Sequence, residues 1–262
     1  MSIVEKWAGL KGFEYLFIDD RMFGYAPDWY KQKVDNRVLP VSDLARLEIA
    51  KDLLSKGYER TIWVDADLLL FDPEKFDIDI QDEFALMKEI WVEKNKFGFV
   101  DFDQKVCNAI SVFTKNNNFL DFYIFVCKSI VQSPQHWIYR FNSSNKLSVK
   151  LKRLRIKLAG DTAYIPSDIV GTQFLTSLYK AVNFRLIDNI GLFSPVLMSE
   201  IAGNNHHHLK KYMTLFGSPL YGANLCGSSI GKDLTEDIAD KVVEKLLSTK
   251  GEVVNQYLGK GL

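Results

Sequence analysis

Two aspartates separated by one residue are the strongest chemical signal in the sequence. Asp65 and Asp67 follow a continuous apolar stretch at 61–64, and more apolar residues come directly after them. Like charges held this close oppose each other's ionisation, so the pair needs a compensating cation. Mg²⁺ or Mn²⁺ accepts one or two protein carboxylates and fills its other positions with phosphate oxygens and water. The spacing therefore indicates a divalent metal site that also recruits a diphosphate.

A second charged pair, Asp43 and Arg46, lies upstream of the aspartates. The two residues are three positions apart and share one face of an expected helix. Taken alone, they indicate an intrahelical ion pair worth about 0.2–0.5 kcal/mol.

The segments around these residues follow an α/β pattern. Residues 61–64 are apolar without alternation, which is typical of a central strand covered on both faces. Pro40 precedes a periodic apolar segment with Ser42 or Asp43 near its N-cap, and Gly57 ends this predicted helix. The other predicted elements are strands at 13–18, 84–88 and 109–113 and a helix from Phe119. This alternation predicts a single α/β domain with a mostly parallel, Rossmann-like central sheet flanked by helices.

Two segments differ from this pattern. Residues 133–160 are rich in Lys, Arg, Asn and Ser, and three interpretations remain open: a lid over the site, an acceptor-binding insertion or a solvated basic loop. Residues 232–262 predict a charged amphipathic helix at the C-terminus.

The order of the motifs resembles the donor site of retaining glycosyltransferases with the GT-A fold. The resemblance rests on Ser-Asp-Leu-Ala-Arg at 42–46, Gly-Tyr at 57–58 and Trp-Val-Asp-Ala-Asp at 63–67. The nearest families in appearance are the capsular-polysaccharide and DXD-sugar-binding-region transferases, and the family-8 transferases and clostridial glucosylating toxins are farther away. The resemblance covers the middle third of the chain well and implies a GT-A-like fold. Residues 13–18 match the family's second strand, so two alternatives remain open: this chain lacks the family's first strand, or another segment takes its place.

The resemblance also implies roles for individual residues. Asp43 would bind hydroxyls of the donor sugar, Arg46 would lie beside the sugar and the diphosphate, and Asp65 and Asp67 would hold Mn²⁺ or Mg²⁺. Asn108 matches an asparagine that lies near the sugar in those families.

The later matches are less complete. Residues 171–176 correspond to the family's Gly-Pro before a helix, with Thr172 in place of the proline. In this region Gln173 is a candidate catalytic residue, and Asp168 is a candidate for lining the same face of the sugar.

A glycine-rich loop near the C-terminus corresponds to the family's His-His-Trp and Ser-Trp motifs, although its tryptophans are absent. Asn224 stands where a metal-binding histidine is usual, and Ser228 or Ser229 would supply a donor-binding hydroxyl. We expect residues 222–231 to pack over Asp65 and Asp67. The alternative is an ordinary Gly/Ser loop.

The composition limits the classes of partner and the cellular compartment that we expect. Lys plus Arg and Asp plus Glu both total 33, so the basic surface of a nucleic-acid-binding protein is not expected. The three cysteines are widely spaced, which favours reduced thiols and a cytoplasmic protein, whether free or peripheral at a membrane. No apolar run reaches the roughly 18–20 residues of a transmembrane helix. The sequence does not indicate an oligomeric state.

The expected reaction is metal-dependent transfer of a sugar from a UDP- or GDP-sugar to a glycan or another hydroxyl acceptor, and the resemblance implies retention of anomeric configuration. One alternative is a catalytically silent module that binds a nucleotide-sugar or a protein partner. Another is a haloacid-dehalogenase-like phosphatase, which also has two aspartates in this spacing after an apolar strand and uses an Asp as the phosphoryl nucleophile. That family has a small residue and then Thr or Val after its aspartates, unlike the leucines at 68–70.

Overall fold

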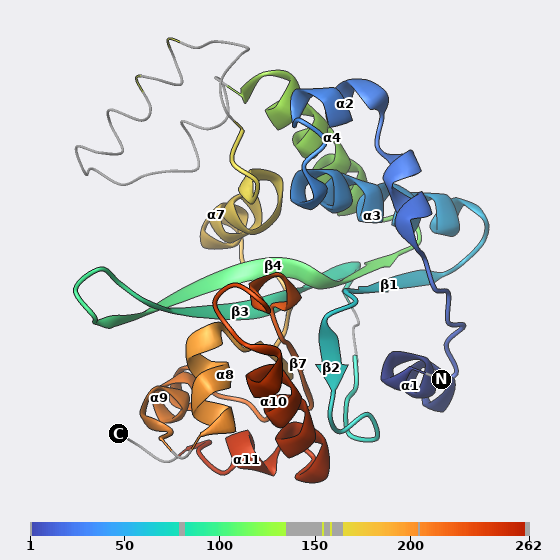
Figure 1. Cartoon of the computed structure of the whole chain (residues 1–262). Helices are drawn as coiled ribbons and strands as arrows, with labels where there is room; N and C mark the ends of the chain where they lie inside the picture. The colour runs from blue at the N-terminus through green and yellow to red at the C-terminus, as the bar shows by residue number, and fades with distance from the viewer. Residues whose placement is uncertain are drawn as a thin grey trace.

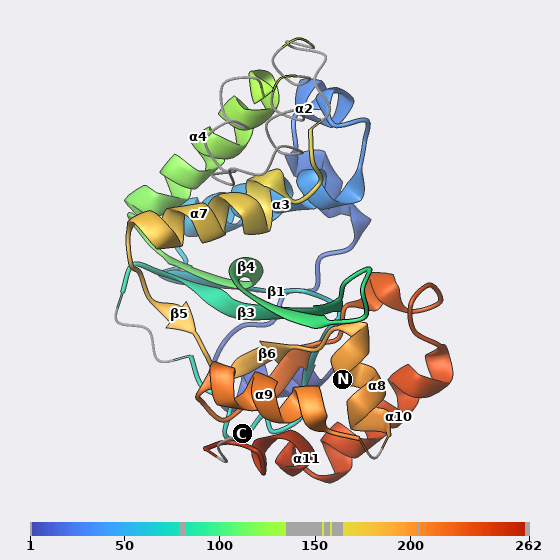
Figure 2. The ribbon, with the colours of Figure 1, turned by 90° about the vertical axis from the view of Figure 1, so that its left-hand side faces the viewer.

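A four-stranded sheet with helices on both faces forms the centre of the molecule (Figures 1 and 2). The computed structural model describes residues 2–78, 82–134, 154, 158, 165–203 and 205–259. The upper layer in Figure 1 contains η1 (Asp20–Tyr25), α2 (Asp28–Lys33), α3 (Val38–Ser55), α4 (Asn118–Gln132) and α7 (Phe174–Ala181). The lower layer contains α8 (Pro195–Ala202), α9 (His207–Phe216), α10 (Glu236–Ser248) and α11 (Glu252–Asn255).

The central sheet is mixed, so the prediction of a mostly parallel sheet is wrong. Its order is β1 (Arg60–Val64), β4 (Val100–Thr114), β3 (Phe84–Lys94) and β5 (Leu186–Ile187). Strands β1 and β3 both run antiparallel to β4, and β5 runs parallel to β3. The reason is the short turn at 95–99, where Asn95 Oδ1 accepts hydrogen bonds from two backbone N–H groups. A tight turn joins strands as an antiparallel hairpin, whereas parallel neighbours need a long crossover.

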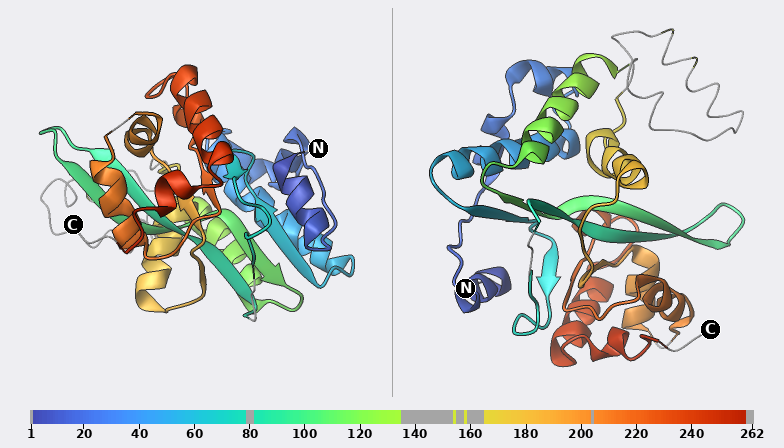
Figure 3. Two further views of the ribbon diagram at one scale, coloured as in Figure 1. Left: turned by 90° about the horizontal axis from the view of Figure 1, so that it is seen from below. Right: turned by 180° about the vertical axis from the view of Figure 1, so that it is seen from behind.

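A smaller sheet lies below the central one (Figure 3). It has the order β2 (Leu68–Leu70), β7 (Gly222–Asn224) and β6 (Ile190–Leu192), with β2 antiparallel and β6 parallel to β7. Because β1 belongs to one sheet and β2 to the other, the turn at 65–67 is where the chain passes between the sheets.

Helix α3 is enclosed along most of its length. It begins at Val38, before the predicted N-cap, and Pro40 lies in its first turn, where a missing N–H leaves no intrahelical bond unmade. Leu44 and Leu47 are fully buried in the upper core together with Tyr123 of α4. Because most of α3 is covered, several of its polar side chains are buried as well.

The pairing of strand β4 with β3 is irregular near Asn108, one of the predicted site residues. Its pairing with β3 shifts between Leu86, which lies opposite Ser111, and Met87, which lies opposite Cys107. The residues between those partners, 108–110, form a bulge, which re-aims side chains relative to the regular alternation. Asn108 lies at this bulge.

The other predicted strands and helices agree with the structure to different degrees. Residues 13–18 form no strand, because no neighbouring strand pairs with them, and Leu16 and Phe17 are exposed. The helix before them, α1 (Ile3–Leu10), packs beside β2. The predicted strands at 84–88 and 109–113 are confirmed as parts of longer strands, and the predicted C-terminal helix begins at Glu236 and is interrupted before α11.

The segment at 133–160 lies outside the described residues except for 133, 134, 154 and 158. Within the part of the chain that is described, no helix has the length and apolar character needed to cross a membrane.

Candidate functional site

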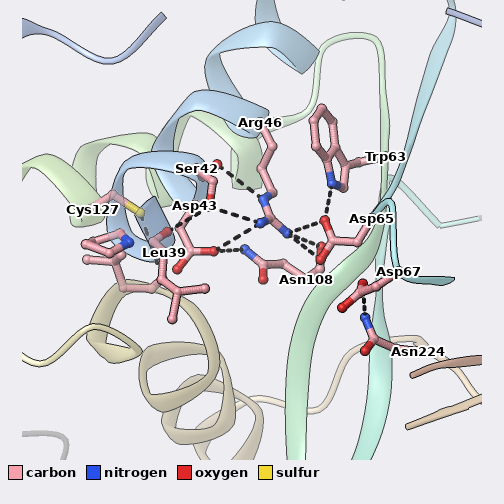
Figure 4. A network of polar contacts seen from close by, with 12 residues as sticks. Leu39, Ser42, Asp43, Arg46, Trp63, Asp65, Asp67, Asn108, Cys127 and Asn224 are labelled. Carbon is pink, nitrogen blue, oxygen red and sulfur yellow. Dashed lines mark hydrogen bonds and ion pairs between the residues drawn. The ribbon is translucent and has the colours of Figure 1, made fainter. Parts of the chain in front are cut away.

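Arg46 is the centre of a buried polar cluster between α3 and the end of β1 (Figure 4). The residue is 6% exposed, and its Nη1 lies 3.1 Å from Asp65 Oδ1 and donates to the Asn108 carbonyl oxygen at 2.9 Å. Its Nη2 lies 3.6 Å from Asp43 Oδ1, and its Nε donates to the Ser42 carbonyl oxygen at 3.2 Å. One guanidinium therefore joins a helix carboxylate to a strand-end carboxylate, a bridge that its planar fork of donors allows.

Asp65 is held from two further directions. The Trp63 Nε1–H donates to Asp65 Oδ1 at 2.6 Å, and the Asp65 backbone N–H donates to the Ala109 carbonyl oxygen at 2.9 Å. The Trp63 ring also lies near the Arg46 guanidinium, with 5.5 Å from Cζ to the ring centroid. These contacts, together with that of Arg46, fix the position of Asp65.

Asp43 begins a second chain of contacts on the other side of Arg46. Asn108 Nδ2 donates to Asp43 Oδ1 at 3.0 Å, and Tyr123 lies close enough for its OH to contact the same amide at 3.5 Å. The Tyr123 OH donates to the Val170 carbonyl oxygen at 2.9 Å. This chain connects α3 to α4 and to η3 (Ile169–Gln173), so three elements fix the orientation of Asp43.

A cavity of about 170 Å³ opens beside this cluster. Its polar lining includes Asp43, Arg46, Asp65, Glu89, Asn108 and Asp168. Ligand pockets commonly measure about 300–1,000 Å³, so this cavity accommodates only one part of a nucleotide-sugar.

Burial and charge act against each other in the cluster. Burial raises the pKa of Asp43 and of Asp65, although the nearby Arg46 guanidinium opposes the rise in both. Burial acts to lower the pKa of Arg46, but Asp65 and Asp43 outweigh it and the pKa is raised. The guanidinium therefore stays charged, and the two carboxylates compete for it.

Asp67 is held by the C-terminal part of the chain instead. Its Oδ1 accepts from Asn224 Nδ2 at 2.7 Å, and its Oδ2 accepts from the Gly227 backbone N–H at 3.0 Å. The loop at 222–231 thus lies against Asp67, as the sequence predicted. Within it, η4 (Gly227–Ser229) follows Cys226, which has a left-handed φ of 49°.

The carboxylates of Asp65 and Asp67 form a two-residue oxygen donor set. Mg²⁺ and Mn²⁺ suit such a set when phosphate oxygens and water complete the coordination, so the residues present fit the expected ion. Asn224 presents its amide nitrogen to Asp67, and its Oδ1 accepts from the Cys226 N–H at 2.8 Å. In this arrangement Asn224 positions Asp67 through its amide nitrogen. The described residues contain no group of three or more His, Cys, Asp or Glu arranged to hold a metal.

In comparisons with known proteins, no family model, curated protein or solved structure matches this chain.

The remaining predicted residues lie at the edge of the site. Gln173 Nε2 donates to Asp168 Oδ1 at 2.7 Å, and Asp168, rather than Gln173, lines the cavity. Ser228 is exposed and Ser229 half-buried in the loop that holds Asp67. The backbone N–H of Ser229 donates to the Cys226 carbonyl oxygen at 2.8 Å.

The sequence did not identify Glu89, Trp63 or Tyr123 as members of the site. Glu89 lies just beyond the predicted strand at 84–88, within an apolar stretch that β3 continues, and the face on which its side chain lies depends on the register of β3 and β4. The sequence assigned no role to Trp63, although it belongs to the motif at 63–67, or to Tyr123.

Proposed function

We propose that this chain is a metal-dependent glycosyltransferase that moves a sugar from a UDP- or GDP-sugar to a hydroxyl of a glycan or another acceptor. The observation that supports this most is the bridge formed by Arg46 between Asp43 and Asp65, next to Asp67 and at the wall of a cavity. A cation flanked by oriented carboxylates suits a ligand that combines hydroxyl groups with a diphosphate.

The residues of the cluster have distinct roles in this proposal. Asp43 accepts hydrogen bonds from hydroxyls of the donor sugar, and Asn108 keeps that carboxylate turned toward the cavity. Arg46 offers positive charge near the diphosphate, where negative charge grows as the bond to the anomeric carbon breaks. We expect the anomeric configuration to be retained, as the motif resemblance implies.

Asp65 and Asp67 would hold Mn²⁺ or Mg²⁺. When bound, such an ion supplies charge that stabilises the departing diphosphate. The bonds from Trp63, Asn224 and Gly227 keep the two carboxylates oriented.

A thermal-shift panel tests the proposal. Each UDP- and GDP-sugar is added with and without MnCl₂, and a donor that binds the native state raises Tm, by mass action. We expect at least one donor to raise Tm only when Mn²⁺ is present, and Asp65→Asn to abolish that rise. Asp121→Asn changes an exposed carboxylate on α4 and is the matched control. A panel in which no donor raises Tm would rule the proposal out.

A catalytically silent nucleotide-sugar-binding module is the second candidate. The internal pairing of Asp65 and Asp67 favours it, because the chain itself satisfies carboxylates that a catalyst would leave partly free for the ion. Sugar release to water or to a mixture of glycan acceptors separates the candidates, since a silent module binds the donor and leaves it intact.

A further inference from the structure

Glu89 is a buried carboxylate that the roles given above do not use. It lies on β3, is 6% exposed and lines the same cavity as Asp43, Arg46 and Asp65. It is far from these residues in sequence and reaches the cavity through the pairing of β3 with the bulged strand β4.

The surroundings of Glu89 do not compensate its charge well. Lys105 lies opposite Glu89 in the register of β4, yet its Nζ lies 3.8 Å from an Asp103 carboxylate oxygen. The Cys107 thiol hydrogen-bonds to Glu89, and a thiol is a weak donor. A buried carboxylate needs stronger donors, and hydroxyl groups of a bound ligand would supply them.

The charged residues that line the cavity also favour a ligand rich in hydroxyl groups. Four carboxylates line it, those of Asp43, Asp65, Glu89 and Asp168, against the guanidinium of Arg46. Ionised carboxylates only accept hydrogen bonds, so this lining suits a ligand rich in hydroxyl donors. A ligand that brings a carboxylate of its own would face like charges at close range, which costs several kcal/mol.

We propose that Glu89 binds hydroxyl groups of the donor sugar and sets the charge class that the site accepts: neutral hexoses enter, and hexoses with a carboxylate are excluded. This inference rests on the proposed glycosyltransferase function and adds a specificity-determining residue to it.

Two matched donor pairs test this inference. UDP-glucose and UDP-glucuronate share all groups except that at C6, and GDP-mannose and GDP-mannuronate form the equivalent pair for the other base. Affinities are measured by calorimetry on the full chain with MnCl₂. We expect the neutral member of the pair with the preferred base to bind at least about tenfold more tightly than the acidic one, since a charged hydrogen bond is gained in one and a repulsion met in the other.

Variants of Glu89 separate the effect of its contact with the donor from the effect of its charge. Glu89→Gln should weaken binding of the neutral donor about tenfold or more and reduce its advantage over the acidic donor. Glu89→Asp keeps the charge but shortens the side chain, so it should weaken the neutral donor while still excluding the acidic one. Glu93→Gln makes the same chemical change at an exposed position of β3 and should leave both affinities unchanged.

The outcomes are distinguishable. If neither the nucleotide-sugars nor UDP and GDP bind in the presence of Mn²⁺, both the proposed function and this inference are wrong. If donors bind but the acidic member of a pair binds as tightly as the neutral one, or Glu89→Gln binds like the original protein, the role of Glu89 is overturned and the proposed function stands.

Discussion

Gly171 lies so close to Asp43 that a Cβ at position 171 would fall 2.7 Å from Asp43 Oδ2. Real Cβ atoms do not approach oxygen this closely, so any side chain here would displace the carboxylate. The absence of a side chain at Gly171 is therefore part of how the cluster holds Asp43 against Asn108 and Arg46.

Gly171→Ala should consequently disturb the site more than the fold. We expect a loss of stability of about 1–3 kcal/mol from overpacking, with donor binding reduced well beyond what that loss explains. Urea denaturation and calorimetry measure the two effects. Gly9→Ala is the control, because a Cβ there meets nothing within 4 Å and alanine favours the helix α1 by about 0.5–1 kcal/mol. Normal donor binding by Gly171→Ala would show that Asp43 does not contact the donor.

Arg46→Ala should be strongly destabilising. It leaves the buried Asp43 and the half-buried Asp65 without their shared cation, and breaking a buried ion pair costs about 3–5 kcal/mol. Lys128→Ala breaks the more exposed ion pair with Glu48 and should cost less than about 1 kcal/mol. Urea midpoints of the two variants check this difference, and similar midpoints would show that Arg46 contributes little to the fold.

Asp67→Asn should affect binding and stability together. The variant keeps one carbonyl oxygen, so either Asn224 or the Gly227 N–H loses its acceptor at a cost of about 1–3 kcal/mol. Metal-dependent donor binding should disappear. Asp237→Asn on α10 alters an exposed ion pair and serves as control. A variant that binds donor with Mn²⁺ as before would exclude Asp67 from the metal site.

Glu89→Gln should raise Tm at neutral pH while weakening donor binding. Burial raises the pKa of Glu89 above that of an unfolded glutamate, and the partly opposing contributions of Lys105 and Cys107 do not reverse the shift. The carboxylates of Asp103 and Asp168 add to the rise.

The sign of the pH effect follows. Between the unfolded and the raised folded pKa, the native state holds a proton that the unfolded state has released, so stability falls as pH rises through this window. Tm measured across about pH 4 to 8 should fall less steeply for Glu89→Gln than for the original protein, and Glu93→Gln should follow the original curve. A lower Tm for Glu89→Gln at neutral pH would mean that the carboxylate stabilises the fold.

The part of the site that the sequence could predict is the part set by local periodicity. The helical spacing of Asp43 and Arg46 placed both on one face, and the apolar run before Asp65 placed it at the end of a covered strand. Both features depend on a few consecutive residues, and the structure brings these three side chains together.

The features that the sequence did not predict depend on pairing between distant segments. The direction of β4 follows from the turn at 95–99, and without that turn the strands looked like members of a parallel sheet. Glu89 entered the site through strand register, which a single sequence does not fix. The apolar run at 13–18 predicted a strand, but a strand also needs a neighbour, and the structure provides none for that segment.

Asp65 and Asp67 are separated by one residue but are held by segments that lie far apart in the sequence. Asp65 is bound by Arg46, 19 residues away, whereas Asp67 is bound by Gly227, 160 residues away. During synthesis a protein chain emerges with its N-terminus first. The contacts of Asp65 with α3 and β4 become possible once residue 109 has emerged, but Asp67 stays without its partners until the segment containing residue 227 has been made. The hydrogen-bond partners of the two carboxylates of one tripeptide therefore become available at widely separated points of synthesis, and the complete pair cannot form before the segment containing residue 227 has been made.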